Sequence, residues 1–141
     1  MFYTITLNTA VDTTVKLKKN KIQGVCKGNI TSKLPAGKGI NCARALRIIS
    51  GRGKKSLKIT CLGFTGKANQ DQFQKELRKY ALTCKLISVP GYTRENITLL
   101  FPDKELHIKT DGYKIKSSFL KKLESDLREI NSDDTVLISG S

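Results

Sequence analysis

The stretch Pro35 to Leu46 (PAGKGINCARAL) holds the residues best suited to bind a polar or anionic ligand. Gly37 and Gly39 allow backbone amides to approach a ligand closely, and they stand directly before a helical pattern. The first turn of a helix presents unpaired N–H groups and a partial positive charge. Lys38 adds a cation and Asn41 a neutral donor and acceptor. Together they suit a hydroxylated or phosphorylated small molecule, although the glycines alone are equally typical of an ordinary strand-to-helix turn.

Three further residues could take part in binding such a molecule. Asp12 follows the first predicted strand and could accept hydrogen bonds from hydroxyl groups, although Asp is also common as a plain turn residue. Arg94 precedes a predicted hairpin and could hold a phosphate through two parallel hydrogen bonds, or could be an ordinary surface arginine. Ser139 lies at the carboxyl end of the last predicted strand, and ligands of open parallel sheets gather at such ends.

Other kinds of site are not predicted. The segments AGKGIN, TGKANQ and GRGKKS all lack Ser or Thr directly after the Gly-Lys pair, so none is a P-loop for ATP. The four cysteines are widely spaced and His107 is the single imidazole, which does not predict a metal site. We expect His107 to lie on an exposed hairpin strand without a special role.

Hydrophobic periodicity predicts the elements that must position these residues. Helices are expected from Gly39 to a stop at Gly51, around Phe73 to Tyr80, and over 117–130. Strands are expected over 2–7, 13–19, 24–34, 56–64, 84–89, 96–101, 105–110 and 134–141. This alternation predicts an α/β fold with a mostly parallel sheet covered by helices. The polar strands within 13–34 should project from the main core, and a chain that stops at the last strand leaves a raw sheet edge and looks cut.

Composition limits the protein to one compact domain of 141 residues, of which 38% are hydrophobic. The net charge of +14 favours an anionic partner, which could be nucleic acid, a membrane surface or a phosphorylated metabolite. Lysines are scattered and aromatic residues do not interleave with them, so a solvated basic surface is preferred over a nucleic-acid platform. No segment could cross a membrane or act as a signal peptide, which favours the cytoplasm.

Several motifs occur in one order and resemble the N-terminal half of a PfkB-type, ribokinase-like carbohydrate kinase. They are TLNTAVD (6–12), PAGKGINCARAL (35–46), LGFTG (62–66), TREN (93–96) and LISGS (137–141). The similarity is to the branch of 1-phosphofructokinases and tagatose-6-phosphate kinases, and it spans essentially the whole chain.

The resemblance implies a role for each candidate residue. Asp12 would bind sugar hydroxyls, Arg94 would grip the phosphate of the substrate, and the glycine loop would line the pocket. The implied substrate-binding residues are Asp12, Gly37, Lys38, Gly39, Asn41, Arg94 and Ser139. The strands at about 13–34 would form a small β lid that closes over the sugar and excludes water. Contact between two lids would make a homodimer.

The implied activity is ATP-dependent phosphorylation of a ketose monophosphate, with Mg²⁺ neutralising the phosphates. Family members are longer, and their second half carries the nucleotide site and the general-base Asp, so we expect no catalytic residue in this chain and no activity from it alone. Thr9 and Ala36 stand where the family has Pro and Gly, and should loosen or crowd the substrate floor. The alternative is a non-catalytic module that binds sugar phosphates or nucleic acid.

Overall fold

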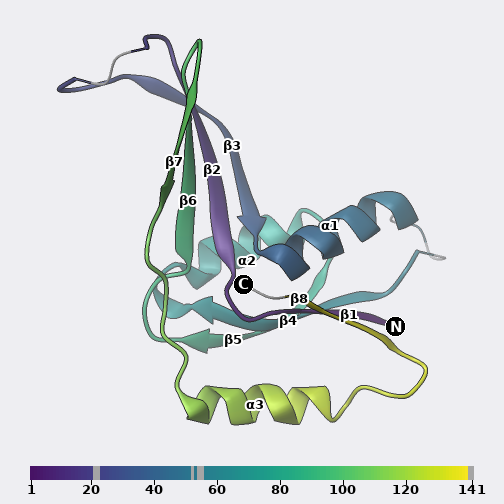
Figure 1. Cartoon of the computed structure of the whole chain (residues 1–141). Coiled ribbons are helices and arrows are strands. Elements are labelled where there is room, and N and C mark those ends of the chain that lie inside the picture. Colours follow the sequence, from purple (N-terminus) through teal and green to yellow (C-terminus); the bar gives the residue numbers. More distant parts are fainter. Residues whose placement is uncertain (21–22, 52, 54–55, 140–141) are drawn as a thin grey trace.

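The computed structural model describes residues 1–20, 23–51, 53 and 56–139. In this part of the chain, strands form two four-stranded sheets, one central and one projecting from it (Figure 1). The last two residues of the LISGS motif, Gly140 and Ser141, lie outside the described residues, as do all three basic residues of the GRGKK cluster.

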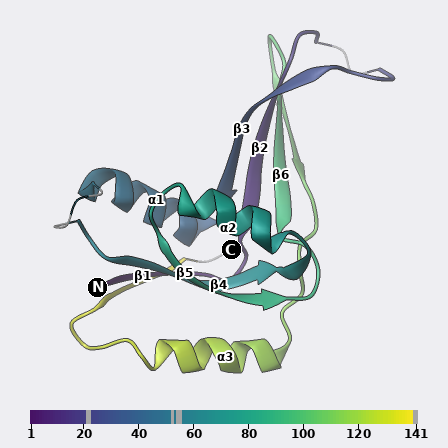
Figure 2. The ribbon, with the colours of Figure 1, turned by 180° about the vertical axis from the view of Figure 1, so that it is seen from behind.

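The central sheet has the strand order β5-β4-β1-β8, and all its neighbouring strands are parallel. These strands are β1 (Phe2–Thr6), β4 (Ile59–Gly66), β5 (Thr83–Val89) and β8 (Thr135–Ser139). Helices α1 (Lys38–Ser50) and α2 (Gln70–Arg78) cover one face, with a short 3-10 turn (Lys67–Asn69) before α2. Helix α3 (Ser117–Leu127) covers the other face (Figures 1 and 2). The predicted parallel sheet flanked by helices is confirmed.

The alternation of side chains along β4 supplies both cores. Cys61 faces α1 and α2, where it joins Ile40, Phe73 and Leu77. The next residue, Leu62, faces α3 and joins a second apolar cluster. Strand β4 is buried along its whole length, as a central strand covered on both faces must be. Burying each large apolar side chain stabilises the fold by about 1.5–3 kcal/mol.

The projecting sheet has the order β3-β2-β6-β7. Its strands are β2 (Ala10–Leu17), β3 (Gly28–Ala36), β6 (Arg94–Leu100) and β7 (Glu105–Lys109). β2 pairs with β3 and β6 with β7 in antiparallel fashion, while β2 and β6 run parallel. We call these four strands the projecting sheet.

The projecting sheet is larger than the range of about 13–34 predicted for its strands. β2 begins at Ala10 and β3 continues to Ala36, so both strands reach the base of the sheet. The hairpin β6-β7 belongs to the same sheet, whereas the sequence left it unassigned. Parallel pairing of β2 with β6 joins residues 84 positions apart, such as Asp12 and Asn96, and alternation within each strand contains no information about that pairing.

The helix boundaries follow local backbone rules. α1 ends at Ser50, and Gly51, which follows with φ 71°, stops the helix as predicted. α3 ends at Leu127, before the predicted end at Ile130, because the following residues form single turns instead. Among the described residues, no helix is both long and apolar enough to cross a membrane.

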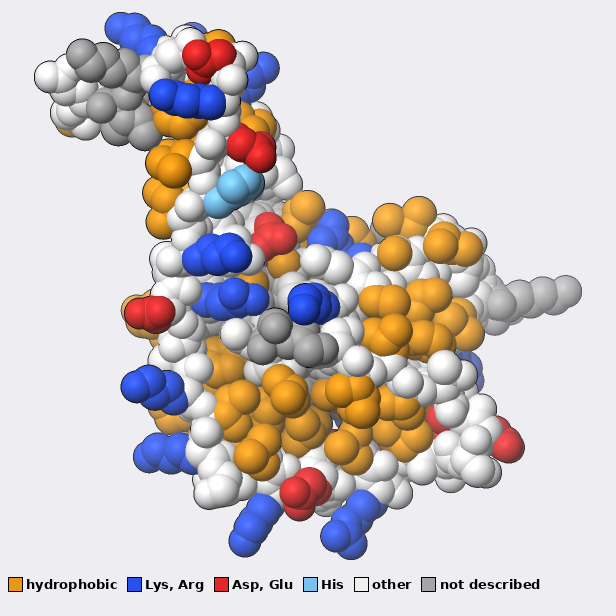
Figure 3. Space-filling model, in the orientation of Figure 1, with side chains coloured by type: hydrophobic (Ala, Val, Ile, Leu, Met, Phe, Trp, Pro, Cys, Tyr) orange, Lys and Arg blue, Asp and Glu red, His pale blue; other side chains and the backbone are white. Residues whose placement is uncertain are grey.

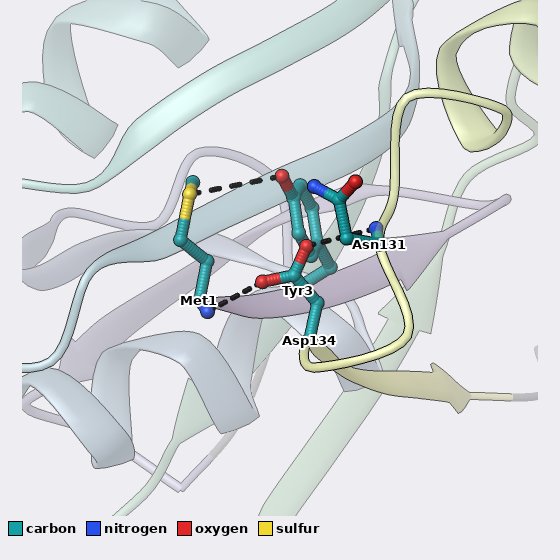
Figure 4. Close-up of polar contacts among 4 residues, drawn as sticks. All are labelled: Met1, Tyr3, Asn131 and Asp134. Atoms are coloured by element: carbon teal, nitrogen blue, oxygen red, sulfur yellow. Dashed lines mark hydrogen bonds and ion pairs between the residues drawn. The ribbon is translucent and has the colours of Figure 1, made fainter.

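The start of β1 is fixed to the turn before β8 (Figure 4). The N-terminal amine of Met1 lies 2.5 Å from Asp134 Oδ1, and Oδ2 accepts a hydrogen bond from the Asn131 amide at 3.0 Å. The Thr135 amide donates to the Met1 carbonyl at 3.0 Å. These bonds align the first residues of two neighbouring parallel strands.

The ion pair at the N-terminus should make stability depend on pH. The hydrogen bond from the N-terminal amine, assisted by the Asn131 amide, lowers the pKa of Asp134. A lowered carboxyl pKa contributes stability above its ordinary value, and this contribution is lost as the pH falls through the folded value. We expect Asp134→Asn to lower the melting temperature at neutral pH and to lose this effect in acid. Asp133→Asn, a change at the exposed neighbour, should have no such pH dependence, and equal effects of both variants would contradict the assignment.

Candidate functional site

The carboxyl end of β1 is the point where the glycine loop meets the central sheet. Thr6, the last residue of β1, pairs with Gly63 of β4 and Ser139 of β8. A Cβ atom at Gly37 would lie 2.6 Å from Thr6 Cγ2. A Cβ atom at Gly39 would overlap Thr6 Oγ1 and lie 2.9 Å from the Ile5 carbonyl oxygen. Both positions therefore require glycine, and the structure brings the predicted glycine loop and Ser139 together around Thr6.

The N-terminus of α1 lies at this end of β1. Gly37 precedes the helix with φ 118°, a conformation that favours glycine. The Asn41 amide is bonded to the Gly37 carbonyl at 2.8 Å, so the amides of residues 38–40 belong to the first turn, which has no intrahelical acceptors. Such a turn attracts anions. Lys38 is exposed beside it and adds a full positive charge.

Asp12 and Arg94 come together at the base of the projecting sheet. Ala10 pairs with Ala36 on one side and with Arg94 on the other. Asp12, two residues beyond Ala10, therefore shares a face of the sheet with Arg94. Gly37 directly follows Ala36, so the glycine loop begins at the edge of the same row.

Asn96 is a site residue that the sequence analysis missed. Its Nδ2 donates a hydrogen bond of 2.7 Å to Asp12 Oδ1. This bond leaves the other carboxylate oxygen of Asp12 to meet a ligand and fixes the orientation of the group. A signal was available in the sequence, because Asn96 lies two residues after Arg94 in a strand and must project from the same face.

Three polar atoms around this site are buried without a hydrogen-bond partner in the described part of the chain. They are Thr6 Oγ1, Arg94 Nε and Asn96 Oδ1. An unsatisfied buried polar atom costs about 1–3 kcal/mol. Their presence at the end of β1 and the start of β6 indicates a place where a polar ligand would supply the missing partners.

The same face of the projecting sheet is hollowed above Asp12. The hollow measures about 340 Å³, and its lining includes Thr14, Asn96, Thr98 and His107. His107 is exposed, as predicted, with Nδ1 3.1 Å from Thr98 Oγ1 and Nε2 3.0 Å from Glu105 Oε1. The hollow thus combines hydroxyl, amide and imidazole groups, which can hydrogen-bond to hydroxylated molecules, with apolar side chains such as Leu34.

Lys38 and Asn41 are less closely packed into the site than the other predicted residues. Both are exposed on the first turn of α1. Asn41 Oδ1 lies 3.5 Å from Arg44 Nη1, within its own helix. In Figure 3, Lys and Arg side chains lie at the tip and at the base of the projecting sheet and also on the central body, with other side chains between them. The positive charge is therefore spread over this face, with part of it beside the site.

Comparison with known proteins gives a consistent match. A sequence profile described as pfkB family carbohydrate kinase matches residues 1–141. A 1-phosphofructokinase of Bacillus subtilis is 30% identical over 141 residues, which is 100% of this chain and 44% of that protein. A 1-phosphofructokinase of Escherichia coli K12 is 30% identical over 143 residues, covering 98% of this chain and 43% of the relative.

Solved structures agree on the fold. Phosphofructokinase-2 of Escherichia coli in complex with fructose-6-phosphate has a TM-score of 0.81 at 23% identity, covering 99% of this chain and 45% of that one. A ribokinase of Giardia lamblia has a TM-score of 0.71 at 17% identity, covering 97% and 44%. At these identities the likeness shows the ribokinase-like fold alone. The chain spans less than half the length of these proteins.

The contact between Gly39 and β1 predicts a large effect of a small substitution. Gly39→Ala should destabilise the protein by about 1–3 kcal/mol, because the added methyl group forces α1 away from Thr6 and Ile5. Denaturant unfolding would measure the change. Gly53→Ala is a matched control, since a Cβ atom there meets nothing within 4 Å. If Gly39→Ala is as stable as the control, the close approach is not a constraint.

Proposed function

Because the chain belongs to the pfkB family of carbohydrate kinases, we propose that it forms the substrate-binding part of an enzyme that phosphorylates a ketose monophosphate. The observation that carries the proposal is the junction where the α1 N-terminus, Asp12 and Arg94 face one region with unsatisfied buried polar atoms. The curated relatives named above are 1-phosphofructokinases, which favours fructose 1-phosphate as the substrate and a bisphosphate as the product. Fructose 6-phosphate and tagatose 6-phosphate are the alternatives.

Each residue has a role that its chemistry supports. The Asp12 carboxylate, held by Asn96, accepts hydrogen bonds from sugar hydroxyls and fixes the orientation of the ring. Arg94 binds the phosphate through charge-assisted hydrogen bonds. Gly37 and Gly39 bring the first-turn amides of α1 close to the sugar, with Lys38, Asn41 and Ser139 around them.

ATP and Mg²⁺ would supply the transferred phosphoryl group and neutralise its charge in the whole kinase. We assign none of the described side chains to either. Within residues 1–20, 23–51, 53 and 56–139, no group of three or more His, Cys, Asp or Glu side chains could hold a metal ion. The role proposed for this chain is therefore to bind and orient the sugar phosphate, and the 141-residue chain alone should form no sugar bisphosphate from ATP.

The projecting sheet is proposed to serve as the lid over the sugar. Its polar face carries Asp12 and the 340 Å³ hollow, which would cover the sugar and reduce the access of water during transfer. On the opposite face the β6-β7 hairpin is apolar toward its tip, with Ile97 paired to Ile108 and Leu99 to Leu106, whereas the Lys33–Glu95 ion pair lies on this face nearer the base. Leu106 and Ile108 remain 46% and 42% exposed, so we propose that two chains pair through this face.

Sugar-phosphate binding can be measured directly by calorimetry on the purified chain. Fructose 1-phosphate should bind more tightly than the two alternative ketose phosphates. Arg94→Ala should weaken its binding by about 2 kcal/mol, roughly thirtyfold, because a charge-assisted phosphate contact is lost. Arg78→Ala, at an exposed position on α2, is the control and should leave the affinity unchanged.

Two results would contradict this proposal. An unchanged affinity in Arg94→Ala would remove Arg94 from the phosphate site. Formation of a sugar bisphosphate by the 141-residue chain with ATP would show that the chain carries its own catalytic group. A basic nucleic-acid binder would instead bind RNA with a steep salt dependence and would ignore competing ketose phosphates.

Pairing through the apolar face can be tested by sedimentation. The native chain should sediment at twice its mass of 15.7 kDa, and the double variant Leu106→Lys/Ile108→Lys should sediment as a monomer because charges cannot be buried unpaired in the interface. Ile49→Lys is the control, because Ile49 is 81% exposed on α1. A monomeric native chain, or dissociation by the control alone, would contradict the proposed dimer.

A further inference from the structure

The hydroxyl group of Tyr113 lies where three separate segments meet. It accepts a hydrogen bond from the Thr9 amide at 2.9 Å and lies 3.1 Å from Thr9 Oγ1. It also lies 3.1 Å from the Leu7 carbonyl oxygen and 3.0 Å from that of Phe64. A phenol has one proton to donate, so it donates to one of these oxygens while it accepts from Thr9. One side chain thus connects the β1-β2 loop, the end of β4 and the segment after β7.

Thr9 is fully buried and its hydrogen bonds are satisfied within this network. Its exposed fraction is 0%, and its Oγ1 donates to the Phe64 carbonyl at 2.8 Å. The effect of Thr9 on the substrate pocket stays a prediction, and the structure shows that Thr9 is held by hydrogen bonds of both its backbone and its side chain. Proline at this position would have no N–H, so Tyr113 would have no backbone donor to accept from.

The position of Thr9 makes this network important for the site. β2 begins at Ala10, directly after Thr9, and Asp12 follows two residues later. Any movement of the Leu7–Thr9 loop is therefore passed to Asp12 through two strand residues. The loop also lies under the glycine loop, since a Cβ atom at Gly37 would be 3.3 Å from Thr9 Cα and 3.4 Å from the Asn8 carbonyl oxygen.

The segment that carries Tyr113 also contacts the strand that carries Arg94. A Cβ atom at Gly112 would lie 3.2 Å from Arg94 Cβ. Thr110 Oγ1 accepts a hydrogen bond from the Glu95 amide at 2.8 Å, and the Thr110 amide donates to the Glu95 carbonyl at 2.9 Å. Tyr113 is therefore anchored next to Arg94 while its hydroxyl group holds the loop that leads to Asp12.

We propose that Tyr113 is a positioning residue, which holds the Leu7–Thr9 loop and thereby sets Asp12 relative to Arg94 in the substrate site. The consequence for ligand affinity rests on the function proposed above, whereas the positioning itself does not. Burial raises the pKa of the Tyr113 phenol, so the hydroxyl keeps its proton over the ordinary pH range and the network stays intact there. The ring packs against the α3-side core, so removing only the oxygen tests the hydroxyl without opening a cavity.

The test compares Tyr113→Phe with Tyr92→Phe, which changes a phenol at a residue that is 66% exposed. Amide hydrogen exchange, followed residue by residue by NMR, is the first measurement. In Tyr113→Phe the amides of Thr9 and Asp12 should exchange about tenfold faster, the factor expected when one hydrogen bond of ordinary strength is lost. The control should leave both rates unchanged. Equal rates in Tyr113→Phe and the native chain would overturn the proposal.

The second measurement is the affinity for fructose 1-phosphate. Tyr113→Phe should weaken binding roughly three- to tenfold, and its effect should be clearly smaller when Thr9→Pro is already present, because the donor that Tyr113 serves is then absent. Equal effects in both backgrounds would show that Tyr113 does not act through Thr9. If the native chain binds no ketose phosphate, the proposed function fails, and the exchange rates still decide whether Tyr113 holds the loop.

Discussion

The close approach of α1 to the end of β1 is the constraint on which the rest of the site depends. Gly37 and Gly39 lie against Thr6 from above, and a Cβ atom at Gly63, which has φ 136°, would overlap the Thr6 carbonyl oxygen from the neighbouring strand. Three glycines therefore surround one threonine. With this packing the helix N-terminus, the end of the sheet and the first residues of the projecting sheet share one small region.

The projecting sheet has two faces of different chemical character. Strand alternation places Asp12, Asn96 and Thr98 on one side and Ile97, Leu99 and Ile108 on the other. On the polar side Asn96 Oδ1 is buried without a hydrogen-bond partner among the described residues, and on the apolar side Leu106 and Ile108 remain exposed. Both faces belong to the same four strands, so the binding and the pairing proposed above would use opposite sides of one sheet.

Local patterns in the sequence predicted most helices and strands, because the pattern that identifies each element lies within a short run of consecutive residues. The apolar run of β4 and the spacing of Phe73 and Leu77 in α2 are examples. The membership of the projecting sheet was not predictable in this way. It depends on β2 pairing with β6, and the choice between possible partners for a polar strand is made by tertiary packing rather than by alternation.

The candidate site likewise contains residues that a local motif predicts and residues that only tertiary contacts reveal. Gly37, Gly39 and Arg94 were found because a motif places them, and the structure gives each a physical reason for its type or position. Asn96 could have been found from strand geometry. Tyr113 could not, because its bond to Thr9 spans 104 residues and comes from an irregular segment after β7. From the sequence alone, Thr9 is likewise only a departure from the proline of the family, because its hydrogen-bond partner Tyr113 is distant in the chain.

The parallel pairing of β2 with β6 also has a consequence for the growing polypeptide. β4, α2 and β5 all lie between these strands in the sequence, so a ribosome must release them before the middle of the projecting sheet can close. Until then β2 and β3 form an isolated two-stranded ribbon, which is at best marginally stable in water. Contacts of such long sequence separation form late and slowly. The part of the fold that would meet the substrate therefore cannot be completed until β4, α2 and β5 have emerged and β6 has followed them.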